Sequence, residues 1–363
     1  MKEQDKINWV LTQLEDEESK FILKNRWEFA NSNDYRYLGE IIDKYVVEFS
    51  DYKWNPNTQE ELIRFIKKSG KRVIIFGAGY NGKSMLRLCR DRGIQVDNLC
   101  DNDLSKQNTK IENVTVISPK AILERGLPED YIIVICIRFG YEEVYNSLIA
   151  MGVPAYNICR FIEHGFSSAQ YFDPVLHFGK DEIFVDGGSY DFSTSEMFLE
   201  KTEKAGGNCK KIYAFEPDEL NYKKCEDKIK NQGLNNVTLM CAGLWKEDAY
   251  VKFCMLGNAG SRILPADRED ADKVKVVALD ECITEKVTFI KLDVEGAELA
   301  ALQGAKNIIL RDRPKLAICI YHKKEDLWEI PYYIKSLVPE YKLYVRHYSN
   351  YGDETVLYAV YEQ

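Results

Sequence analysis

Apolar and polar positions follow a helical period at the start of the chain. In residues 1–68, apolar side chains such as Trp9 and Leu14 recur at the spacing of a helix face. A turn at Asn55-Pro-Asn57 precedes a last helix over 58–68. The pattern therefore predicts a helical region over the first 68 residues.

Residues 69–165 show short apolar runs that alternate with helical segments. The predicted strands are 72–76, 96–100 and 131–137, and the predicted helices are 83–92 and 140–151. Strands separated by helices favour a parallel sheet, so we predict a Rossmann-like α/β domain over 69–165. The segment 164–174 is the predicted linker to the following part.

The same alternation restarts after the linker. The predicted strands are 182–186, 211–216, 237–241, 287–293 and 315–321, with helices near 193–204, 219–232, 296–310 and 326–337. Two further strands, 341–347 and 355–361, are joined too tightly for a crossover helix, so they must be antiparallel. A mostly parallel sheet closed by an antiparallel carboxyl-terminal strand is typical of a Rossmann-like methyltransferase. We predict such a domain over 166–363.

Composition limits the classes of partner. The chain has 363 residues, a net charge of −9 and no block of Lys and Arg, which disfavours a nucleic-acid partner. The 10 cysteines form no CxxC pair, so we expect reduced thiols and a cytoplasmic protein. The longest uncharged apolar run, 131–137, is too short to span a membrane. The sequence does not decide between a monomer and a homo-oligomer.

Two predicted strands of the second α/β part end at a carboxylate. Asp186 is followed by Gly187 and Gly188, and Glu216 ends the next strand. The glycines allow close approach of a ligand, and the following helix offers free N–H groups to a carboxylate. Asp186 could accept hydrogen bonds from an α-amino group, and Glu216 from ribose hydroxyls. This chemistry matches S-adenosylmethionine (SAM), although a tight strand–helix turn with a capping Asp would look similar.

A third strand end carries Asp293, Glu295 and Glu298. We expect Asp293 to face the ligand cleft and Glu298 to stabilise the next helix N-terminus. A divalent metal held by Asp293 and Glu295 is an open alternative, but the two carboxylates lack a clear third ligand, so no metal site is assigned. His322 follows the fifth strand and is a candidate general base, with an exposed or capping histidine as an equal alternative. His347 is expected to be structural or to orient a substrate.

The first α/β domain has its own glycine motif. Gly77, Gly79 and Gly82 follow a strand and open a helix, and Asp101 ends the next strand, which is the full dinucleotide fingerprint. The motif is compatible with NAD or a nucleotide-sugar as a second ligand. The same glycines also serve plain packing of a helix on a strand, and this structural role is the favoured interpretation.

From Gln170 to Tyr361 the chain resembles the FkbM family of SAM-dependent methyltransferases. The matching stretches are Tyr171-Phe-Asp173, Phe184-Val-Asp-Gly-Gly-Ser-Tyr-Asp191, Phe215-Glu-Pro-Asp218, Gly243-Leu-Trp245, Gly260-Ser-Arg262, Lys291-Leu-Asp-Val-Glu-Gly-Ala-Glu298, Tyr321-His322 and Leu343–Tyr358. The front half also resembles N-terminal regions of some bacterial members. Where relatives often have Asp-Gly, this chain has Asp191-Phe192. Phe192 does not easily adopt a positive φ, so we expect a local difference in the loop.

The resemblance implies methyl transfer to an oxygen, with a sugar, glycan or related small molecule as acceptor. The predicted cofactor-binding residues are Asp186, Gly187, Gly188, Ser189, Tyr190, Glu216, Pro217 and Ala242. The predicted catalytic residues are Asp293, Glu295 and His322. Two other functions remain open: an NAD- or nucleotide-sugar-dependent enzyme that uses the first glycine motif, and a non-catalytic SAM-binding module.

Overall fold

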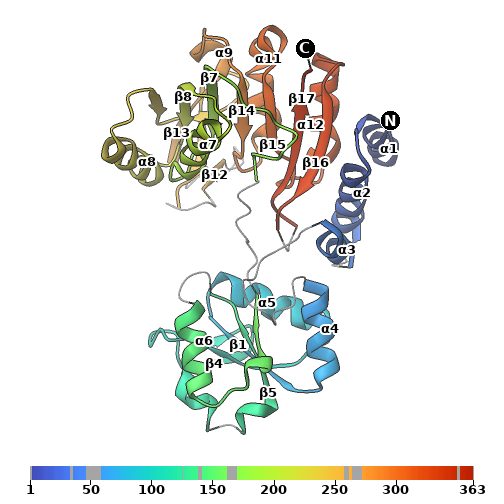
Figure 1. The fold of residues 1–363 in the computed structure, drawn as a ribbon, viewed down its shortest axis with the longest axis vertical. Helices are drawn as coiled ribbons and strands as arrows, with labels where there is room; N and C mark the ends of the chain where they lie inside the picture. The colour runs from blue at the N-terminus through green and yellow to red at the C-terminus, as the bar shows by residue number, and fades with distance from the viewer. Residues whose placement is uncertain are drawn as a thin grey trace. The chain divides into compact units, whose positions relative to one another are not determined.

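The computed structural model describes residues 2–32, 36–45, 59–124, 126–137, 141–161, 170–256, 261–263, 272–349 and 352–362. The chain divides into two compact units (Figure 1), of which one contains 1–32, 166–348 and 352–363 and the other 33–165 and 349–351. We call them the carboxyl-terminal unit and the glycine-motif unit. The helices of the first 68 residues are thus shared between the two units.

The carboxyl-terminal unit is built on a seven-stranded sheet in the order β16-β17-β15-β14-β7-β8-β9. Its strands are β7 (Glu182–Gly187), β8 (Cys209–Phe215), β9 (Val237–Met240), β14 (Phe289–Leu292), β15 (Lys315–Cys319), β16 (Lys342–His347) and β17 (Thr355–Val360). All neighbours are parallel except the pairs formed by β17, which are antiparallel. This confirms the predicted α/β fold, a mostly parallel sheet closed by an antiparallel carboxyl-terminal strand.

Helices connect the strands of this sheet and cover it (Figure 1). They are α7 (Ser193–Lys204), α8 (Glu219–Gln232), α9 (Leu279–Cys282), α10 (Glu298–Gln303), α11 (Lys306–Asp312) and α12 (Asp326–Leu337). The single helix predicted over 296–310 is two helices, which meet at Gly304. A Cβ at Gly304 would lie 2.0 Å from the Trp245 carbonyl oxygen, so only glycine allows this close backbone contact.

A second, four-stranded sheet in the order β10-β13-β11-β12 was not predicted from the sequence. Its strands are β10 (Gly243–Leu244), β11 (Ala249–Cys254), β12 (Arg262–Ile263) and β13 (Asp272–Val277). Two of these strands are only two residues long, and β13 carries exposed polar side chains near its start. Such short, half-polar segments give little periodic signal.

The first two helices pack on the edge of the seven-stranded sheet. They are α1 (Glu3–Gln13) and α2 (Glu17–Ser32), and α2 lies along β16 (Figure 1). The Ser19 hydroxyl accepts a hydrogen bond from the Val345 amide at 2.9 Å. Asp16 binds the Arg346 guanidinium at 2.7 Å. The fully buried Ser19 therefore joins the start of the chain to the last part of the sheet.

The glycine-motif unit contains a six-stranded sheet in the order β3-β4-β2-β1-β5-β6. Its strands are β1 (Arg72–Phe76), β2 (Val96–Cys100), β3 (Lys110–Ile111), β4 (Val114–Ile117), β5 (Tyr131–Ile135) and β6 (Ile158–Arg160). Its helices are α3 (Arg36–Tyr45), α4 (Gln59–Ser69), α5 (Tyr80–Asp91) and α6 (Tyr141–Ala150), with short 3₁₀ turns at Pro119–Ile122, Pro128–Asp130 and Ala155–Asn157. Only the β3–β4 pair is antiparallel, so the predicted parallel sheet is present.

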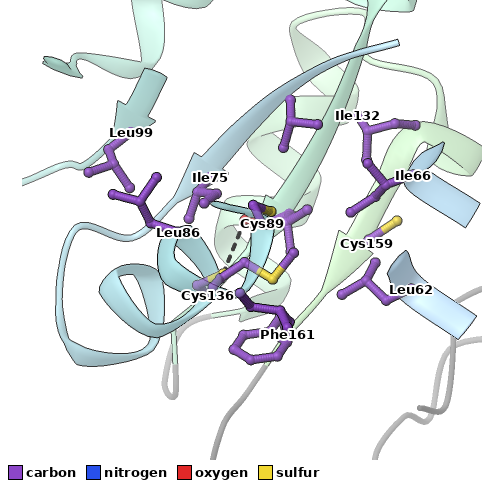
Figure 2. Packing of buried hydrophobic residues seen from close by; sticks show 14 of the residues in the cluster. Leu62, Ile66, Ile75, Leu86, Cys89, Leu99, Ile132, Cys136, Cys159 and Phe161 are labelled. Carbon is purple, nitrogen blue, oxygen red and sulfur yellow. Dashed lines mark hydrogen bonds between the residues drawn. The ribbon is translucent and has the colours of Figure 1, made fainter. Parts of the chain in front are cut away.

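Cysteines contribute to the apolar core of the glycine-motif unit. Cys89, Cys136 and Cys159 lie among side chains such as Ile75 and Phe161 (Figure 2). Burial raises the pKa of Cys89 and of Cys159 to about 12. These thiols therefore act as small apolar side chains, and all 10 cysteines of the chain are free.

Two sequence predictions fall on residues outside the described ranges. The turn at Asn55-Pro-Asn57 is one, and only residues 170–174 of the predicted linker are described. Among the described residues, no helix is both long and apolar enough to cross a bilayer.

Candidate functional site

The carboxyl ends of four neighbouring parallel strands carry polar side chains. Asp186 lies in β7, Glu216 follows β8, Asp293 follows β14, and His322 lies three residues beyond β15. Because these strands are adjacent and parallel in the sheet, their carboxyl ends share one edge. In open α/β sheets this edge is where ligands bind.

A glycine turn leaves the end of β7 in contact with the end of β14. Gly188 has a φ of +76°, and a Cβ there would lie 1.9 Å from the Asp293 carbonyl oxygen. Two residues beyond the turn also have positive φ: Tyr190 at 52° and Phe192 at 68°. The expectation that Phe192 would not adopt a positive φ is wrong. Its ring is fully buried in the core, and burial of a phenyl ring outweighs a backbone cost of about 1–2 kcal/mol.

Asp186 is completely buried and has partners for both carboxylate oxygens. Lys291 Nζ lies 3.1 Å from Oδ1, and the Ser195 hydroxyl donates to Oδ2 at 2.7 Å. Lys291 is the cross-strand neighbour of Asp186 and also donates to the carbonyls of Gly187 and Gly188, at 3.0 and 2.7 Å. Burial lowers the pKa of Lys291, but Asp186 and Asp293 raise it more, so the ammonium ion is stabilised. This ion pair fixes the glycine turn.

Glu216 is a buried carboxylate that has no cationic partner in direct contact among the described residues. Its oxygens accept hydrogen bonds from the backbone amides of Asp218 and Tyr190, at 2.9 and 2.8 Å. Burial raises the pKa of Glu216 to about 7, although these two hydrogen bonds and Lys291 favour the ionised form. Asp218 caps α8 and accepts a hydrogen bond from Ser261 at 2.7 Å.

Asp293 is held by two tyrosine hydroxyls. Tyr171 donates to Oδ2 at 2.7 Å and Tyr321 donates to Oδ1 at 3.2 Å. Burial raises the pKa of Asp293, but His322, Lys291 and Tyr171 lower it more, so the carboxylate form is stabilised. Burial, followed by repulsion from Asp293, holds the pKa of the nearby Glu354 well above its usual value.

His322 faces three carboxylates. Its Nδ1 lies 3.0 Å from Glu298 Oε1, and its Nε2 lies 3.6 Å from both Asp293 Oδ1 and Glu295 Oε2. Burial lowers the pKa of His322, but Glu298, Glu295 and Asp293 together hold it well above its usual value. The structure therefore brings together the three predicted catalytic residues, with an imidazole that favours its protonated form.

The remaining predicted cofactor-binding residues surround the glycine turn. Ser189 donates to the Asp186 carbonyl at 3.1 Å, and the Tyr190 side chain is partly exposed. Pro217 contacts Gly243, and Ala242 is buried just beyond β9. His347, predicted as structural or orienting, lies with Nδ1 2.9 Å from the Thr355 hydroxyl.

The glycine motif of the glycine-motif unit makes its close contacts within that unit. A Cβ at Gly82 would lie 1.7 Å from the Gly77 carbonyl oxygen, which is the close helix–strand packing expected of the motif. Asp101 accepts a hydrogen bond from the Ala78 amide at 2.8 Å and an ion pair from Lys106 at 3.1 Å. Gly79 caps α5. The carboxylate of the dinucleotide fingerprint, Asp101, thus has partners within its own unit.

Sequence reasoning missed four polar residues of the site: Lys291, Ser195, Tyr171 and Tyr321. Lys291 had a recognisable signal, since a lysine inside the apolar run of Phe289–Leu292 needs a buried partner on an adjacent strand. The two tyrosines begin stretches that resemble the FkbM family, but nothing local indicated their contact with Asp293. Tyr171 and Asp293, for example, are 122 residues apart and meet only through the fold.

Residues 186–349 match the model of the methyltransferase FkbM domain, and residues 69–159 match a C2185-like N-terminal model. The structure is similar to that of Methyltransferase FkbM from Methylobacillus flagellatus KT. The TM-score is 0.52 at 18% identity, over 92% of this chain and 100% of the other, which indicates a shared fold.

More distant similarities extend over half of this chain. An rRNA methylase from Streptococcus thermophilus has 16% identity and a TM-score of 0.34, over 51% of this chain and 89% of the other. A putative methyltransferase from Streptococcus mutans in complex with SAH has 15% identity and a TM-score of 0.32, over 50% and 91%. No curated protein matches the chain. Within the carboxyl-terminal unit, residues 186–349 thus match the methyltransferase FkbM domain, and the fold is shared with an FkbM methyltransferase.

Proposed function

We propose that this protein is a SAM-dependent methyltransferase that methylates a hydroxyl oxygen of a sugar, a glycan or a related small molecule. The observation that carries the proposal is Glu216, a buried carboxylate at a strand end beside the glycine turn. Burial of an acid without a cation in direct contact is costly, and hydrogen bonds from a ligand would offset that cost. The match of residues 186–349 to the methyltransferase FkbM domain supports the same function.

The residues around the glycine turn fit SAM in a specific way. Each oxygen of Glu216 accepts one backbone hydrogen bond, so both retain a lone pair for ribose hydroxyls. Asp186 is completely buried and its charge is already paired with the Lys291 ammonium, so we assign it a positioning role, in which Ser195 assists. When bound, SAM supplies a methyl group on a sulfonium that an oxygen nucleophile can displace.

The acceptor side of the site would be formed by Asp293, Glu295 and His322. Their role is to align the acceptor hydroxyl and to remove its proton, and alignment alone can contribute about 7–11 kcal/mol to lowering a barrier. A group of carboxylates accepts hydrogen bonds from hydroxyls and repels phosphates. This charge favours an uncharged, hydroxyl-rich acceptor over a nucleic acid.

Titration calorimetry on the full chain tests the cofactor assignment. S-adenosylhomocysteine is expected to bind and NAD to give no heat. Glu216→Ala should weaken S-adenosylhomocysteine by about tenfold or more, because a hydrogen bond to a charged group is worth about 1.5–3 kcal/mol.

The matched control is Glu219→Ala, since Glu219 is exposed at the start of α8. It should bind like the unaltered protein. Heat with NAD and none with S-adenosylhomocysteine would contradict the proposal.

A further inference from the structure

Asp293, Glu295 and His322 lie close together without hydrogen bonds between them. One ligand atom from each lies within 4.8 Å of the others. The two separations of 3.6 Å from His322 Nε2 to the carboxylate oxygens exceed hydrogen-bond length. A cation bonded to each ligand at about 2.0–2.2 Å would allow ligand atoms to lie up to about 4.4 Å apart, so both separations fit. The spacing of the three side chains is therefore compatible with a shared cation.

Buried atoms without partners support this interpretation. Neither ring nitrogen of His322 has a hydrogen-bond partner among the described residues, and neither has Oε2 of the fully buried Glu298. A buried imidazole nitrogen that bonds to nothing is costly unless a ligand binds it. An Nε2 lone pair directed between two carboxylate oxygens is a typical metal ligand.

Glu298 lies against the other ring nitrogen of His322, where it could orient the imidazole as a metal ligand. Its Oε1 lies 3.0 Å from His322 Nδ1 and also accepts the amides of Val294 and Gly296, at 2.9 and 3.3 Å. Metal-bound histidines usually present their second nitrogen to a carboxylate in this manner. The same contacts fold the loop so that Glu295, with a φ of +54°, reaches the imidazole.

The charge of the cluster also calls for a cation. Three carboxylates surround one imidazole, so even a protonated His322 leaves an excess of negative charge. The nearest buried ammonium, that of Lys291, is paired with Asp186. Lys323 Nζ donates to the Gly296 carbonyl rather than to a carboxylate of the cluster.

We propose that Asp293, Glu295 and His322 bind a divalent cation of the Mg²⁺ and Mn²⁺ class, with Glu298 as the residue that orients the imidazole. Two carboxylates and one imidazole suit these ions, which also keep positions open for oxygen ligands. The role of the cation rests on the proposed function: it would bind the acceptor hydroxyl and lower its pKa. The cation would thereby assist the removal of the acceptor's proton that the proposed function assigns to this cluster.

Manganese binding to the full chain, stripped with a chelator, tests the site without an acceptor. Electron paramagnetic resonance of Mn²⁺ should show one bound ion per chain, displaced by Mg²⁺. Glu295→Gln and His322→Gln should each weaken Mn²⁺ binding about tenfold or more, which is the usual scale for changes to residues of a metal site. The matched control is Glu203→Gln, because Glu203 is an exposed residue of α7. This variant should bind Mn²⁺ as tightly as the unaltered chain.

The outcomes separate this inference from the proposed function. No Mn²⁺ bound by the folded protein, or equal binding by both variants and the unaltered chain, would overturn the metal site. S-adenosylhomocysteine should bind in the presence of the chelator, because Glu216 is not a ligand of the cation. Mn²⁺ binding without S-adenosylhomocysteine binding would instead contradict the SAM assignment and leave the metal site supported.

Discussion

Gly188 is the residue at which backbone geometry and site geometry meet. Two separate constraints act there: a φ of +76° and a Cβ position 1.9 Å from the Asp293 carbonyl oxygen. Gly206 has nearly the same φ, +74°, but nothing lies within 4 Å of its Cβ position. The two glycines therefore allow backbone strain to be separated from collision.

We predict that Gly206→Ala lowers the free energy of unfolding by about 1–2 kcal/mol and leaves cofactor binding unchanged. Gly188→Ala should lower the free energy of unfolding by more and should also weaken the binding of S-adenosylhomocysteine, because the Asp293 backbone must move to admit the alanine methyl group. Denaturant unfolding and calorimetry measure the two effects. Equal losses of stability in both variants, with intact binding, would show that the contact at Gly188 relaxes freely.

Glu216 makes cofactor binding depend on pH. Burial raises the pKa of Glu216 to about 7, so the proton stays bound to the folded protein where an unfolded chain would have lost it. As pH rises from about 4.5 to about 7, this group therefore makes the folded state less stable. Ribose hydroxyls donate to the ionised carboxylate, so binding competes with the proton.

The expected result is that S-adenosylhomocysteine binds up to about tenfold more weakly at pH 6 than at pH 8, one proton being displaced per ligand. Calorimetry in buffers of different ionisation enthalpy measures that proton. Glu216→Gln should bind weakly at both pH values with no such slope. A slope that persists in Glu216→Gln would assign the pH dependence to another group.

The chemistry of single residues was predictable where a residue type and a strand end coincide. Glu216, Asp293 and His322 follow apolar runs that the sequence reveals, and parallel strands bring such positions to one edge. Lys291, the ion-pair partner of Asp186, could not be predicted in the same way. Its position beside Asp186 depends on the register of β7 and β14, and no local sequence pattern reveals that register. For the same reason the sequence offered only two ligands for a metal, whereas the fold brings His322 to both carboxylates.

At the scale of elements, the carboxyl end of β9 lies beside the proposed ribose site. The Glu216 amide donates to the Met240 carbonyl at 3.1 Å, and Cys241 is the next residue. Cys241 is the one exposed cysteine among the 10 in the chain. Burial raises the pKa of Cys241, and Glu219 and Glu216 add to this effect. A slow but selective alkylation of Cys241 is therefore available as a probe.

We predict that saturating S-adenosylhomocysteine slows alkylation of Cys241 by iodoacetamide several-fold, because the ligand would cover the end of β9. Mass spectrometry of the modified peptide measures the rate, and Cys241→Ser removes the signal. NAD should not protect the thiol. If saturating S-adenosylhomocysteine left the alkylation rate unchanged, the ligand would not bind at the end of β9.

Elements with strong periodicity were predicted well, and elements stabilised by distant contacts were not. The helices predicted over 193–204, 219–232 and 326–337 agree with α7, α8 and α12. Long apolar faces specify such helices locally. The short strands β10 and β12 form only because β13 and β11 pair with them, so the sequence of each carries almost no information.

At the scale of the whole molecule, the order of the chain differs from its division in space. Residues 1–32 belong to the same unit as 166–348, with the glycine-motif unit between them in sequence. The contact that ties α2 to β16 is polar and buried: Ser19 accepts from the Val345 amide and from the Arg346 guanidinium, both at 2.9 Å. The amino-terminal helix α2 thus covers the edge of the sheet in the carboxyl-terminal unit.

Because of this arrangement, removal of the Ser19 hydroxyl should destabilise the carboxyl-terminal unit. Ser19→Ala leaves a buried amide and a buried guanidinium nitrogen with one acceptor fewer, and it should lower the free energy of unfolding by about 1–3 kcal/mol. Hydrogen exchange should quicken in β16 and β17 and stay unchanged in β1 and β5, because the glycine-motif unit has its own core. Ser336→Ala, an exposed site on α12, is the control and should change neither measurement. Faster exchange in both units after Ser19→Ala would mean that the two units unfold together, with the early helices supporting both.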